Sequence, residues 1–290
     1  MDAQTLRKHL LELVRLAACD LAPDVEQALT QARDREEGRA RSTLDWMLKN
    51  ADEARKSSTP ICQDTGSLIF YVDHGRDYRP GVFMQAASEA AAEATELSYL
   101  RPNAVDPVTG KNSGNNVGRG SPYVHFNETD DDQVLKVRLM LKGGGSENCG
   151  VQYTLPDAAI KAGRDLSGVK RCILNAALRA QGFGCAPGVL GVGIGGDRMT
   201  SYMESKEQFF RKLDDRNPDP VLAELEDEMV QKICELGIGP MGFGGKSTVL
   251  GVKAGLRHRL PACYFVSVSY TCWAYRRRSL EIVDGQPRYS

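Results

Sequence analysis

The sequence predicts an α+β protein, in which a helical N-terminal region packs on a mixed or antiparallel sheet domain. Apolar residues recur at helical spacing through the first fifth of the chain, and period-two strand patterns return only later. Helices and strands then mix without the regular alternation of parallel βαβ units. No internal repeat and no clear linker divides the chain. We therefore treat residues 1–290 as one domain, with residues 1–57 as its helical subregion.

Helices are expected where apolar residues repeat every three or four positions, or where alanine, the best helix former, dominates. Leu6, Leu10 and Leu13 give this pattern over residues 3–19. Pro23 suits the first turn of a second helix, because its missing N–H would be unpaired there in any case. Further helices are expected over residues 36–54, 81–100, 168–181 and 204–213, and from Asp219-Pro220 to a stop at Gly237.

Strands are expected where apolar and polar residues alternate, or where aromatic and β-branched residues gather. The clearest runs from Gln133 to Leu141, and two shorter ones cover Gly188–Gly196 and Cys263–Tyr270. Residues 101–120 show no period and are rich in Pro, Asn, Gly, Asp and Ser. Long irregular segments of this kind are uncommon in compact domains and are often functional.

The composition excludes several classes of protein. Of the 290 residues, 41% are hydrophobic and 26% are charged, which allows a sizeable core and argues against disorder. The net charge of −1 provides no general attraction to nucleic acid or to anionic membranes. No apolar stretch approaches the roughly 20 residues of a membrane span, and the N-terminus lacks the apolar run of a signal peptide. We therefore expect a cytoplasmic protein.

Eight cysteines occur without any C-x-x-C pair, so neither a zinc ribbon nor a thioredoxin-like motif is present. In a reducing cytoplasm they should remain thiols. Three fall within helical patterns, where a core role is favoured: Cys19, Cys172 and Cys234. Three others stand beside Gly, Pro or polar residues at the ends of expected elements, where a functional role is favoured: Cys62, Cys185 and Cys272.

The segment Pro60–Gly66 is the most informative stretch of the chain. It places the thiol of Cys62 beside the amide of Gln63 and the carboxylate of Asp64, just before an apolar run. Such a thiol can hold a metal while its neighbours contact a polar substrate. Taken alone, Cys62 is also compatible with a buried free cysteine in a turn, because free cysteine commonly acts as a small core hydrophobe.

Three glycine-rich stretches, over residues 142–146, 191–196 and 242–248, could bring backbone N–H groups close to an anion. The last is not a P-loop, because Pro240 stands where the motif requires glycine. The second does not match a dinucleotide-binding loop that leads into a helix. Taken alone, each stretch fits a tight structural turn as well as it fits an anion-binding loop. Together with three loop cysteines, they favour a site for a small anion.

His258 stands between Arg257 and Arg259, just before the last expected strand. Two interpretations fit this position. One is a basic surface turn. The other is a contact to a substrate carboxylate, which arginine and protonated histidine suit in charge and geometry.

Seven motifs, taken together and in order, resemble the class I fumarate hydratases, which depend on an iron–sulfur cluster, and specifically their larger N-terminal part. The motifs are Pro60–Gly66, Arg101–Pro107, Asn112–Asn115, Lys142–Asn148, Gly184–Pro187, Gly242–Thr248 and Cys272–Ala274. The α subunit of L-tartrate dehydratase belongs to the same group. The resemblance extends to about Arg278, and two of the glycine-rich motifs are more similar to fumarases than to tartrate dehydratases.

This resemblance implies a [4Fe–4S] cluster held by the thiolates of Cys62, Cys185 and Cys272, with one iron open to substrate. The residues implied to contact a small dicarboxylate are Gln63, Asp64, Arg101, the Gly145 region and, as a less specific match, His258. Asp64 is the expected acid or base, tuned by Arg101 and the cluster. The implied reaction is the reversible hydration of fumarate to L-malate, a step of the tricarboxylic acid cycle.

The resemblance also implies a partner. In such proteins a smaller second region supplies part of the substrate site and a catalytic threonine, either as a fused C-terminal domain or as a separate subunit. The sequence ends at Ser290 without that region. We therefore expect either an α subunit that needs a β subunit or an N-terminal catalytic domain, inactive by itself, and a homodimer of this chain.

Other functions are compatible with the same residues. An L-tartrate dehydratase α subunit would differ in the diacid it accepts. A non-catalytic iron–sulfur protein would keep the cysteines, although the presence of Gln63, Asp64 and Arg101 favours an enzyme. A zinc-binding protein also fits the residue types, because three cysteines and an open position can bind zinc.

Overall fold

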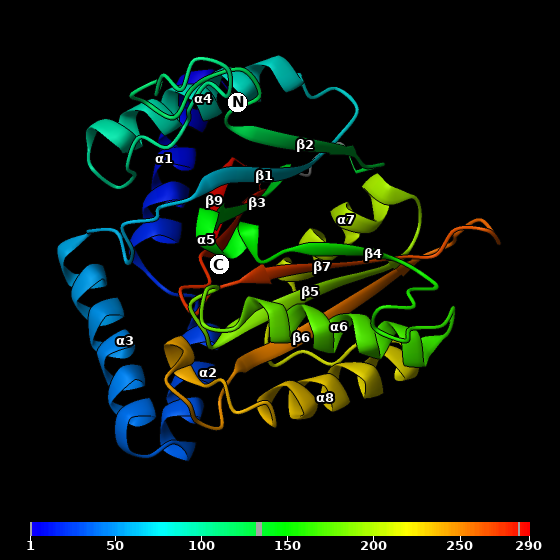
Figure 1. Ribbon diagram of the computed structural model, residues 1–290. Helices are drawn as coiled ribbons and strands as arrows, with labels where there is room; N and C mark the ends of the chain where they lie inside the picture. The colour runs from blue at the N-terminus through cyan, green and yellow to red at the C-terminus, as the bar shows by residue number, and fades with distance from the viewer. Residues whose placement is uncertain (1, 132–134, 284) are drawn as a thin grey trace. The chain divides into compact units, whose positions relative to one another are not determined.

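The computed structural model describes residues 2–131, 135–283 and 285–290. It confirms the α+β class, with helices and two mixed sheets distributed over two compact units (Figure 1). The first unit comprises Met1–Ala22, Lys49–Gly144 and Arg276–Ser290, and the second comprises Pro23–Leu48 and Gly145–Tyr275. Each unit is assembled from separated segments of the chain. The single domain expected over residues 1–290 stays a prediction.

The first fifth of the chain is helical, as predicted. Its helices are α1 (Ala3–Cys19), α2 (Pro23–Arg35) and α3 (Gly38–Ser57). Asp2 caps α1 by accepting a hydrogen bond from the backbone N–H of Thr5. These helices do not form a compact subregion of their own, because α1 belongs to the first unit and α2 to the second.

The sheet of the first unit has the order β2-β1-β3-β8-β9 among its described residues. Only β1 and β2 are parallel neighbours, and the other adjacent pairs are antiparallel. The strands are β1 (Ser67–His74), β2 (Tyr123–Glu128), β3 (Leu135–Lys142), β8 (Arg277–Val283) and β9 (Gln286–Tyr289). The alternation predicted from Gln133 to Leu141 is confirmed over β3, while Gln133 itself lies outside the described residues.

Helices α1 and α4 (Pro80–Glu96) cover one face of this sheet (Figure 1). Alternate residues of β1 and β3 point into the core that the helices close: Leu68, Phe70, Val72, Val137, Leu139 and Leu141. The face of α4 toward the core is largely alanine, and these small side chains let α4 pack closely on α1. Burial of apolar surface at about 25 cal/mol per Å² is the main force that holds this layer together.

The sheet of the second unit has the order β4-β7-β5-β6 in the part of the chain that the structure describes. The strands are β4 (Val151–Thr154), β5 (Gly188–Gly195), β6 (Val249–Arg257) and β7 (Phe265–Thr271). β5 and β6 run parallel, whereas β7 is antiparallel to both of its neighbours. The predicted strands at Gly188–Gly196 and Cys263–Tyr270 are thus confirmed as β5 and β7.

Two helices, α6 (Leu166–Ala180) and α8 (Pro220–Cys234), pack on one face of this sheet (Figure 1). They bury Leu190, Val192 and Ile194, which point from β5 toward the helices. Asp residues cap both helices at their N-termini. The side chain of each cap accepts backbone N–H groups that the first turn leaves unpaired.

The opposite face of β5 carries glycines, and α7 (Arg198–Glu207) lies directly on them. A Cβ on Gly193 would stand 2.0 Å from the carbonyl oxygen of Ser201, and one on Gly191 would stand 2.0 Å from that of Ser205. Only glycine permits this approach of a helix to a strand. The glycines of β5 therefore serve helix packing.

The helix expected over residues 204–213 begins earlier in the structure. Asp197 caps α7 by accepting from the backbone N–H groups of Met199 and Thr200, so the helix starts at Arg198. It ends at Glu207, where a 3₁₀ turn, Gln208–Phe210, follows. The capping aspartate was the local signal for this start.

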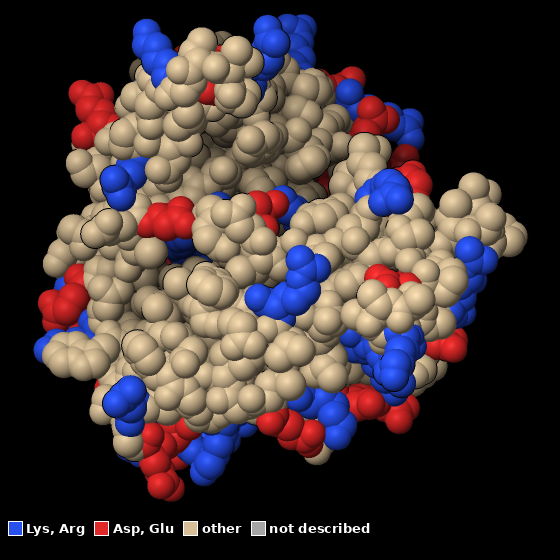
Figure 2. Space-filling view, in the orientation of Figure 1, with Lys and Arg blue, Asp and Glu red and all other residues tan. Residues whose placement is uncertain are grey.

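Charged side chains of both signs are interspersed on the face of the molecule shown in Figure 2, which fits the net charge of −1. No extended region of a single sign is visible there. Among the described residues, no helix combines the length and the apolar character that a membrane crossing requires.

Substituting Gly193→Ala should destabilise the protein by about 1–3 kcal/mol or more, because the new Cβ overpacks the contact between β5 and α7. Gly81→Ala is the matched control, since nothing lies within 4 Å of a Cβ at that exposed position of α4. The control should gain about 0.5–1 kcal/mol from helix propensity. Urea unfolding measures both, and equal stability of the two variants would contradict the packing described here.

Candidate functional site

The Cys62 turn lies between α3 and β1 in the first unit and is tied to the preceding helices. The backbone N–H of Ile61 donates to the carbonyl of Ala18 at 3.0 Å. The side-chain amide of Asn50 donates to the carbonyl of Ile61 at 2.8 Å. The thiol of Cys62 is half-buried, and its neighbour Gln63 is exposed. The turn therefore presents the side chains of Cys62 and Gln63 from an anchored backbone.

The end of this turn lies against the backbone where β3 ends. A Cβ on Gly66 would stand 2.6 Å from the carbonyl carbon of Lys142 and 2.8 Å from the nitrogen of Gly143. The φ angle of Gly66 is +80°. The close approach and the left-handed backbone both require glycine. This contact joins two motifs that the sequence assigned to one site, Pro60–Gly66 and Lys142–Asn148.

The hydroxyl of Thr65 links the turn to the irregular segment 101–120. Thr65 is fully buried, and its Oγ1 accepts from the backbone N–H of Arg101 at 3.0 Å and from Nδ2 of Asn103 at 2.9 Å. A buried hydroxyl with two donors is a satisfied acceptor. Thr65 therefore fixes the start of the segment beside the Cys62 turn, although 36 residues separate Thr65 from Arg101.

Asn116, which is 3% exposed, orders the same segment from its other end. Its Nδ2 donates to the carbonyl of Arg101 and to Oγ1 of Thr95, each at 2.8 Å. Its Oδ1 accepts from the backbone N–H of Asn103 at 2.7 Å. Side-chain amides and hydroxyls, together with isolated backbone bridges such as Val105–Asn112, therefore satisfy the backbone groups of this irregular segment.

Arg101 and Gln63 lie side by side at the surface of the first unit. Nη1 of Arg101 is 3.5 Å from Oε1 of Gln63, which is the long limit of a hydrogen bond. Both side chains are exposed. A guanidinium offers paired N–H donors that match a carboxylate, and the amide adds further donors. This pair is therefore suited to bind a carboxylate.

Asp64 lies beside Gly143 at the end of β3. Its Oδ2 is 2.8 Å from the position that a Cβ on Gly143 would occupy. Nη2 of Arg276 lies 3.3 Å from the same position. The carboxylate is half-buried, whereas Arg276 is 2% exposed. The first unit thus brings Asp64 next to a buried cation that was not among the predicted site residues.

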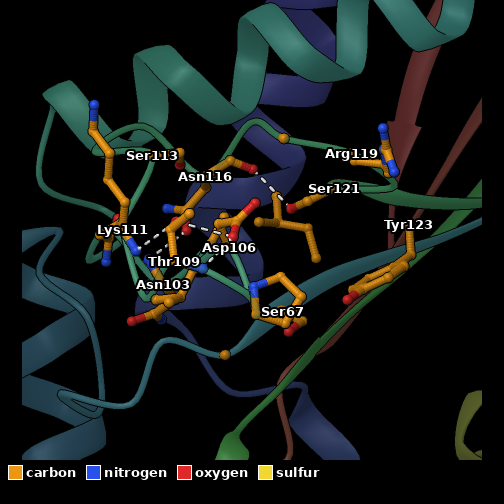
Figure 3. A pocket seen from close by; sticks show the side chains of 17 residues that line it. Ser67, Asn103, Asp106, Thr109, Lys111, Ser113, Asn116, Arg119, Ser121 and Tyr123 are labelled. Carbon is orange, nitrogen blue, oxygen red and sulfur yellow. Dashed lines mark hydrogen bonds between the residues drawn. The ribbon is translucent and has the colours of Figure 1, made fainter.

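A cavity of about 570 Å³ lies in the first unit, beside the start of β1 and the irregular segment (Figure 3). Figure 3 shows Lys111 and Arg119 at opposite sides of it, so its cations do not converge. Asp106 is held by the backbone N–H of Thr109, which lowers the pKa of that carboxyl. The lining includes none of the predicted site residues, so we do not assign the reaction to this cavity.

In the second unit, β5 and β7 bring Cys185 and Cys272 to one end of the sheet. Cys185 precedes β5 and Cys272 follows β7, and these strands are antiparallel. The backbone N–H of Trp273 donates to the carbonyl of Cys185 at 3.1 Å. Both thiols are half-buried. Two of the three predicted cluster ligands are therefore close together, while Cys62 belongs to the first unit.

The backbone of Cys185 is strained. Its φ angle of +55° lies in the left-handed region, which costs a non-glycine residue about 1–2 kcal/mol. The ring of Tyr270 packs against the flanking residues Gly184 and Gly188, where an added Cβ would stand 2.4 and 2.3 Å from the tyrosine. Strain of this kind persists where the surrounding structure imposes it, and it is common at functional sites.

Gly145 lies next to the loop that carries Cys185. It belongs to the short helix α5 (Gly144–Asn148), and a Cβ on Gly145 would stand 3.8 Å from the carbonyl oxygen of Phe183. The thiol of Cys149 donates to the carbonyl of Gly145 at 3.5 Å. Burial raises the pKa of Tyr270, and neighbouring thiols, including Cys149, add to this shift. The predictions missed Cys149 as a thiol of this neighbourhood.

The glycine-rich stretch 242–248 does bind an anion, but the anion is a side chain of the protein. Oε1 of Glu36 accepts from the backbone N–H groups of Lys246 at 2.7 Å and Ser247 at 2.5 Å. Glu36 is 3% exposed and packs on Gly245. The same stretch supports the cysteine loop, because Gly182 has room for no side chain beside it. A substrate has no access to these donors.

His258 lies away from the two thiols of the second unit. It directly follows the end of β6, whereas Cys185 precedes the start of β5. Because β5 and β6 are parallel, these two positions lie at opposite ends of the sheet. His258 is also exposed. The structure therefore does not bring His258 together with Cys185 and Cys272, and the surface-turn interpretation fits its position.

The core role predicted for two of the helical cysteines is confirmed. Cys19 and Cys172 are buried, and burial raises their pKa values to about 11 and about 12, respectively. Neutral, enclosed thiols of this kind are unreactive. Cys234 is half-buried and directs its thiol to the carbonyl of Val249 at 3.7 Å.

The donor chemistry of Cys62, Cys185 and Cys272 fits an iron–sulfur cluster. All three thiols are half-buried and lie outside the helices and strands. Thiolates are the ligands such clusters take. Within the described ranges, no three His, Cys, Asp or Glu side chains converge on a position for a single metal ion. A cluster binds each thiolate through a different iron, so its ligands need a different spacing.

Sequence reasoning missed Thr65, Asn116 and Arg276. Thr65 lies inside the motif Pro60–Gly66 and Asn116 directly follows the motif Asn112–Asn115, and these positions were the only signal in the sequence. Arg276 opens a run of three arginines, a pattern typical of a solvated surface, yet all three side chains are buried. Nothing local distinguishes a buried basic run from an exposed one.

A family profile described as fumarate hydratase (Fumerase) matches residues 7–281, which is most of the chain. The protein therefore belongs to the fumarate hydratase family. The recognition of this family from the sequence motifs is confirmed.

Individual relatives agree with this assignment. The chain is 44% identical over 284 residues to a Geobacillus stearothermophilus protein named "Putative fumarate hydratase class I", covering 96% of this chain and 55% of that protein. It thus spans about half the length of that relative. It is 35% identical over 274 residues to the "Putative L(+)-tartrate dehydratase subunit alpha" of Methanocaldococcus jannaschii, covering 92% and 94% of the two chains. The L(+)-tartrate dehydratase subunit alpha of Escherichia coli K12 is 31% identical over 261 residues, 89% of this chain and 84% of that subunit.

Replacing Thr65 by valine should destabilise the protein by about 1–3 kcal/mol, because the N–H of Arg101 and the amide of Asn103 lose their buried acceptor. Thr65→Ser keeps the hydroxyl and should retain most of the stability. Urea unfolding measures the loss, and limited proteolysis of residues 101–120 reports whether the segment loosens. A valine variant as stable and as protease-resistant as the serine variant would rule out this role for Thr65.

Proposed function

We propose that this chain is the α part of a hydro-lyase that reversibly hydrates a small dicarboxylate, with fumarate and L-malate as the substrate pair. The observation that carries the proposal is the arrangement around Thr65. It places Arg101 beside the segment that presents Cys62, Gln63 and Asp64. Membership of the fumarate hydratase family supports the same reaction.

Cys62, Cys185 and Cys272 would hold a [4Fe–4S] cluster. When bound through three thiolates, such a cluster supplies an open iron that acts as a Lewis acid toward the substrate. The three thiols are half-buried, and the loops of Cys62 and Cys185 are anchored by backbone hydrogen bonds. The strained backbone of Cys185 fits a side chain whose direction serves function rather than stability.

Arg101 and Gln63 would bind one carboxylate of the substrate. Their side chains are adjacent and exposed, and their mutual hydrogen bond is long enough to be exchanged easily for one to a ligand. The exposed backbone at Gly145 would contribute a further donor. Holding a diacid at more than one point limits its orientations, and good positioning can lower a reaction barrier by about 7–11 kcal/mol.

Asp64 would move the proton. Hydration places a hydroxyl group on one alkene carbon and a proton on the other, and dehydration removes both. Asp64 immediately follows Gln63, so its carboxylate is within one residue of the proposed substrate contact. A positioned carboxylate that donates or accepts this proton contributes typically 10²–10⁴-fold to the rate. We assign no role to His258, given its place at the far end of the second sheet.

A partner would complete the enzyme. Two of the relatives are named as α subunits of L(+)-tartrate dehydratase, a name that implies a second subunit in those proteins. We propose that this chain acts with a β subunit or an equivalent C-terminal domain, as a homodimer of the α part, in the cytoplasm. All eight cysteines are free thiols, which suits a reducing compartment.

L(+)-tartrate is the alternative substrate. Its similarity to the L(+)-tartrate dehydratase α subunits, at 35% and 31% identity, supports this alternative. The higher identity to the class I fumarate hydratase favours fumarate. The diacid therefore has to be decided by a direct comparison of rates.

With the cluster reconstituted anaerobically and a β subunit or C-terminal domain supplied, the chain should hydrate fumarate faster than it dehydrates L(+)-tartrate.

Asp64→Asn should lower the turnover by about 10²–10⁴-fold at unchanged cluster content, because the asparagine amide cannot donate or accept the proton as a carboxyl group does. Steady-state rates and the visible absorbance of the cluster measure both. Full activity of a fully loaded Asp64→Asn enzyme would remove Asp64 from the mechanism.

Cluster loading should protect Cys62, Cys185 and Cys272 from alkylation by iodoacetamide, because the ligand sulfurs become unavailable. Cys234 and Cys263 are matched controls, since they are half-buried as well but are not proposed ligands. Mass spectrometry of the chain before and after reconstitution measures the extent of alkylation at each cysteine. Equal labelling of the three proposed ligands in both states would exclude them as the ligand set.

A further inference from the structure

Arg276 is a buried cation that the proposed chemistry leaves without a role. Its side chain is 2% exposed, and its Nε and Nη1 atoms are buried without a hydrogen-bond partner. A guanidinium stays charged in proteins, and burying a charge without full hydrogen bonding is costly. Unsatisfied buried groups are rare in folded proteins, and catalytic sites are among the places that retain them.

The guanidinium of Arg276 and the carboxylate of Asp64 converge on the same point. That point is the position of the missing side chain of Gly143, which lies 3.3 Å from Nη2 of Arg276 and 2.8 Å from Oδ2 of Asp64. Arg276 is buried and Asp64 is half-buried, and opposite charges attract more strongly where protein replaces part of the surrounding water. Glycine at position 143 is what leaves the gap open.

The backbone of Arg276 is held by the sheet of the first unit. The N–H of Leu141 donates to the carbonyl of Arg276 at 3.0 Å, and β8 begins at the next residue, Arg277, opposite Met140 of β3. Gly143 follows the end of that same strand, β3. Both sides of the gap are therefore fixed by one strand pair, which is the rigid support that a positioned functional group needs.

We propose that Arg276 is a positioning residue that holds the carboxylate of Asp64 in its working orientation across the gap at Gly143. Its effect on catalysis rests on the proposed function, whereas the coupling between the two side chains does not. A carboxylate that drifts by about 1 Å from its productive place can lose about 10²-fold in rate. The charge of Arg276 would prevent this drift.

A double-mutant cycle on the full chain tests the coupling without any activity. Arg276→Gln, Asp64→Asn and the double variant are compared with the parent by thermal unfolding. We expect the shift in melting temperature of the double variant to differ from the sum of the two single shifts, because each substitution removes the partner of the other. Shifts that simply add would overturn the proposal.

Arg278→Gln is the matched control for the cycle. Arg278 is another buried arginine and lies in β8, but its guanidinium pairs with Asp20 at 2.9 Å. Combined with Asp64→Asn, it should give additive shifts. If Arg276→Gln fails to fold, Arg276→Met, which removes the positive charge and keeps a long side chain, replaces it in the same cycle.

A second arm fills the gap instead of removing the charge. Gly143→Ala places a Cβ within 3.3 Å of both groups, whereas one on Gly144 would stand 3.9 Å from Oδ2 of Asp64. In the Gly143→Ala background, the non-additivity between Arg276→Gln and Asp64→Asn should shrink, and in Gly144→Ala it should persist. If the two backgrounds show the same non-additivity, the coupling between Arg276 and Asp64 does not act across the gap at Gly143, and the proposal is overturned.

In the reconstituted enzyme, Arg276→Gln should lower kcat by about 10–10²-fold, while KM and the cluster absorbance stay near their parental values. Arg276→Lys, which keeps the positive charge, should show a smaller loss of kcat. A merely structural role would instead lower the yield of folded protein at unchanged kcat per cluster, which would contradict the proposal. If the parent enzyme hydrates no diacid, the proposed function fails, and the unfolding cycle still decides whether Arg276 and Asp64 are coupled.

Discussion

The first unit's part of the site depends on the contact of Gly66 with the backbone of Lys142 and Gly143. No side chain fits between these segments, so the Cys62 turn lies directly on the end of β3. This contact brings Asp64 to Gly143 and, through the next pair of strands, to Arg276. The adjacent hydroxyl of Thr65 then fixes Arg101 beside the turn. The close approach at Gly66 therefore sets the position of Asp64 against Gly143, and Thr65 sets that of Arg101.

The second unit uses glycine for a similar purpose. Gly184 and Gly188 leave room for the ring of Tyr270 beneath the loop that carries Cys185. The thiol of Cys185 then lies near Cys272, on a strained backbone. In both units the candidate site residues stand on loops that pack by close approach of backbone segments, and packed loops hold their side chains precisely.

Much of the fold could be predicted from the sequence because its signals are local. Aspartates mark the starts of several helices, and each does so by accepting N–H groups only two or three residues away. Period-two alternation marked β3, since alternate side chains of a strand face opposite sides. The adjacency of Cys62, Gln63 and Asp64 is likewise a property of the chain itself, and ordered motifs were enough to indicate the family.

The tertiary structure decided what depends on partners far away in the chain. Glu36 occupies the donors of a glycine-rich stretch some two hundred residues later, so a stretch typical of an anion site proved to be satisfied internally. The parallel pairing of β5 and β6 moved His258 to the far end of the sheet from Cys185. The pairing of β8 with β3 placed the buried side chain of Arg276 near Asp64. By itself the sequence determined the family and which local structures form, because ordered motifs, propensity, capping and periodic burial are read over a few residues at a time. Which of those residues meet was decided only by long-range packing, because burial and hydrogen-bond partners depend on segments that no local pattern brings together.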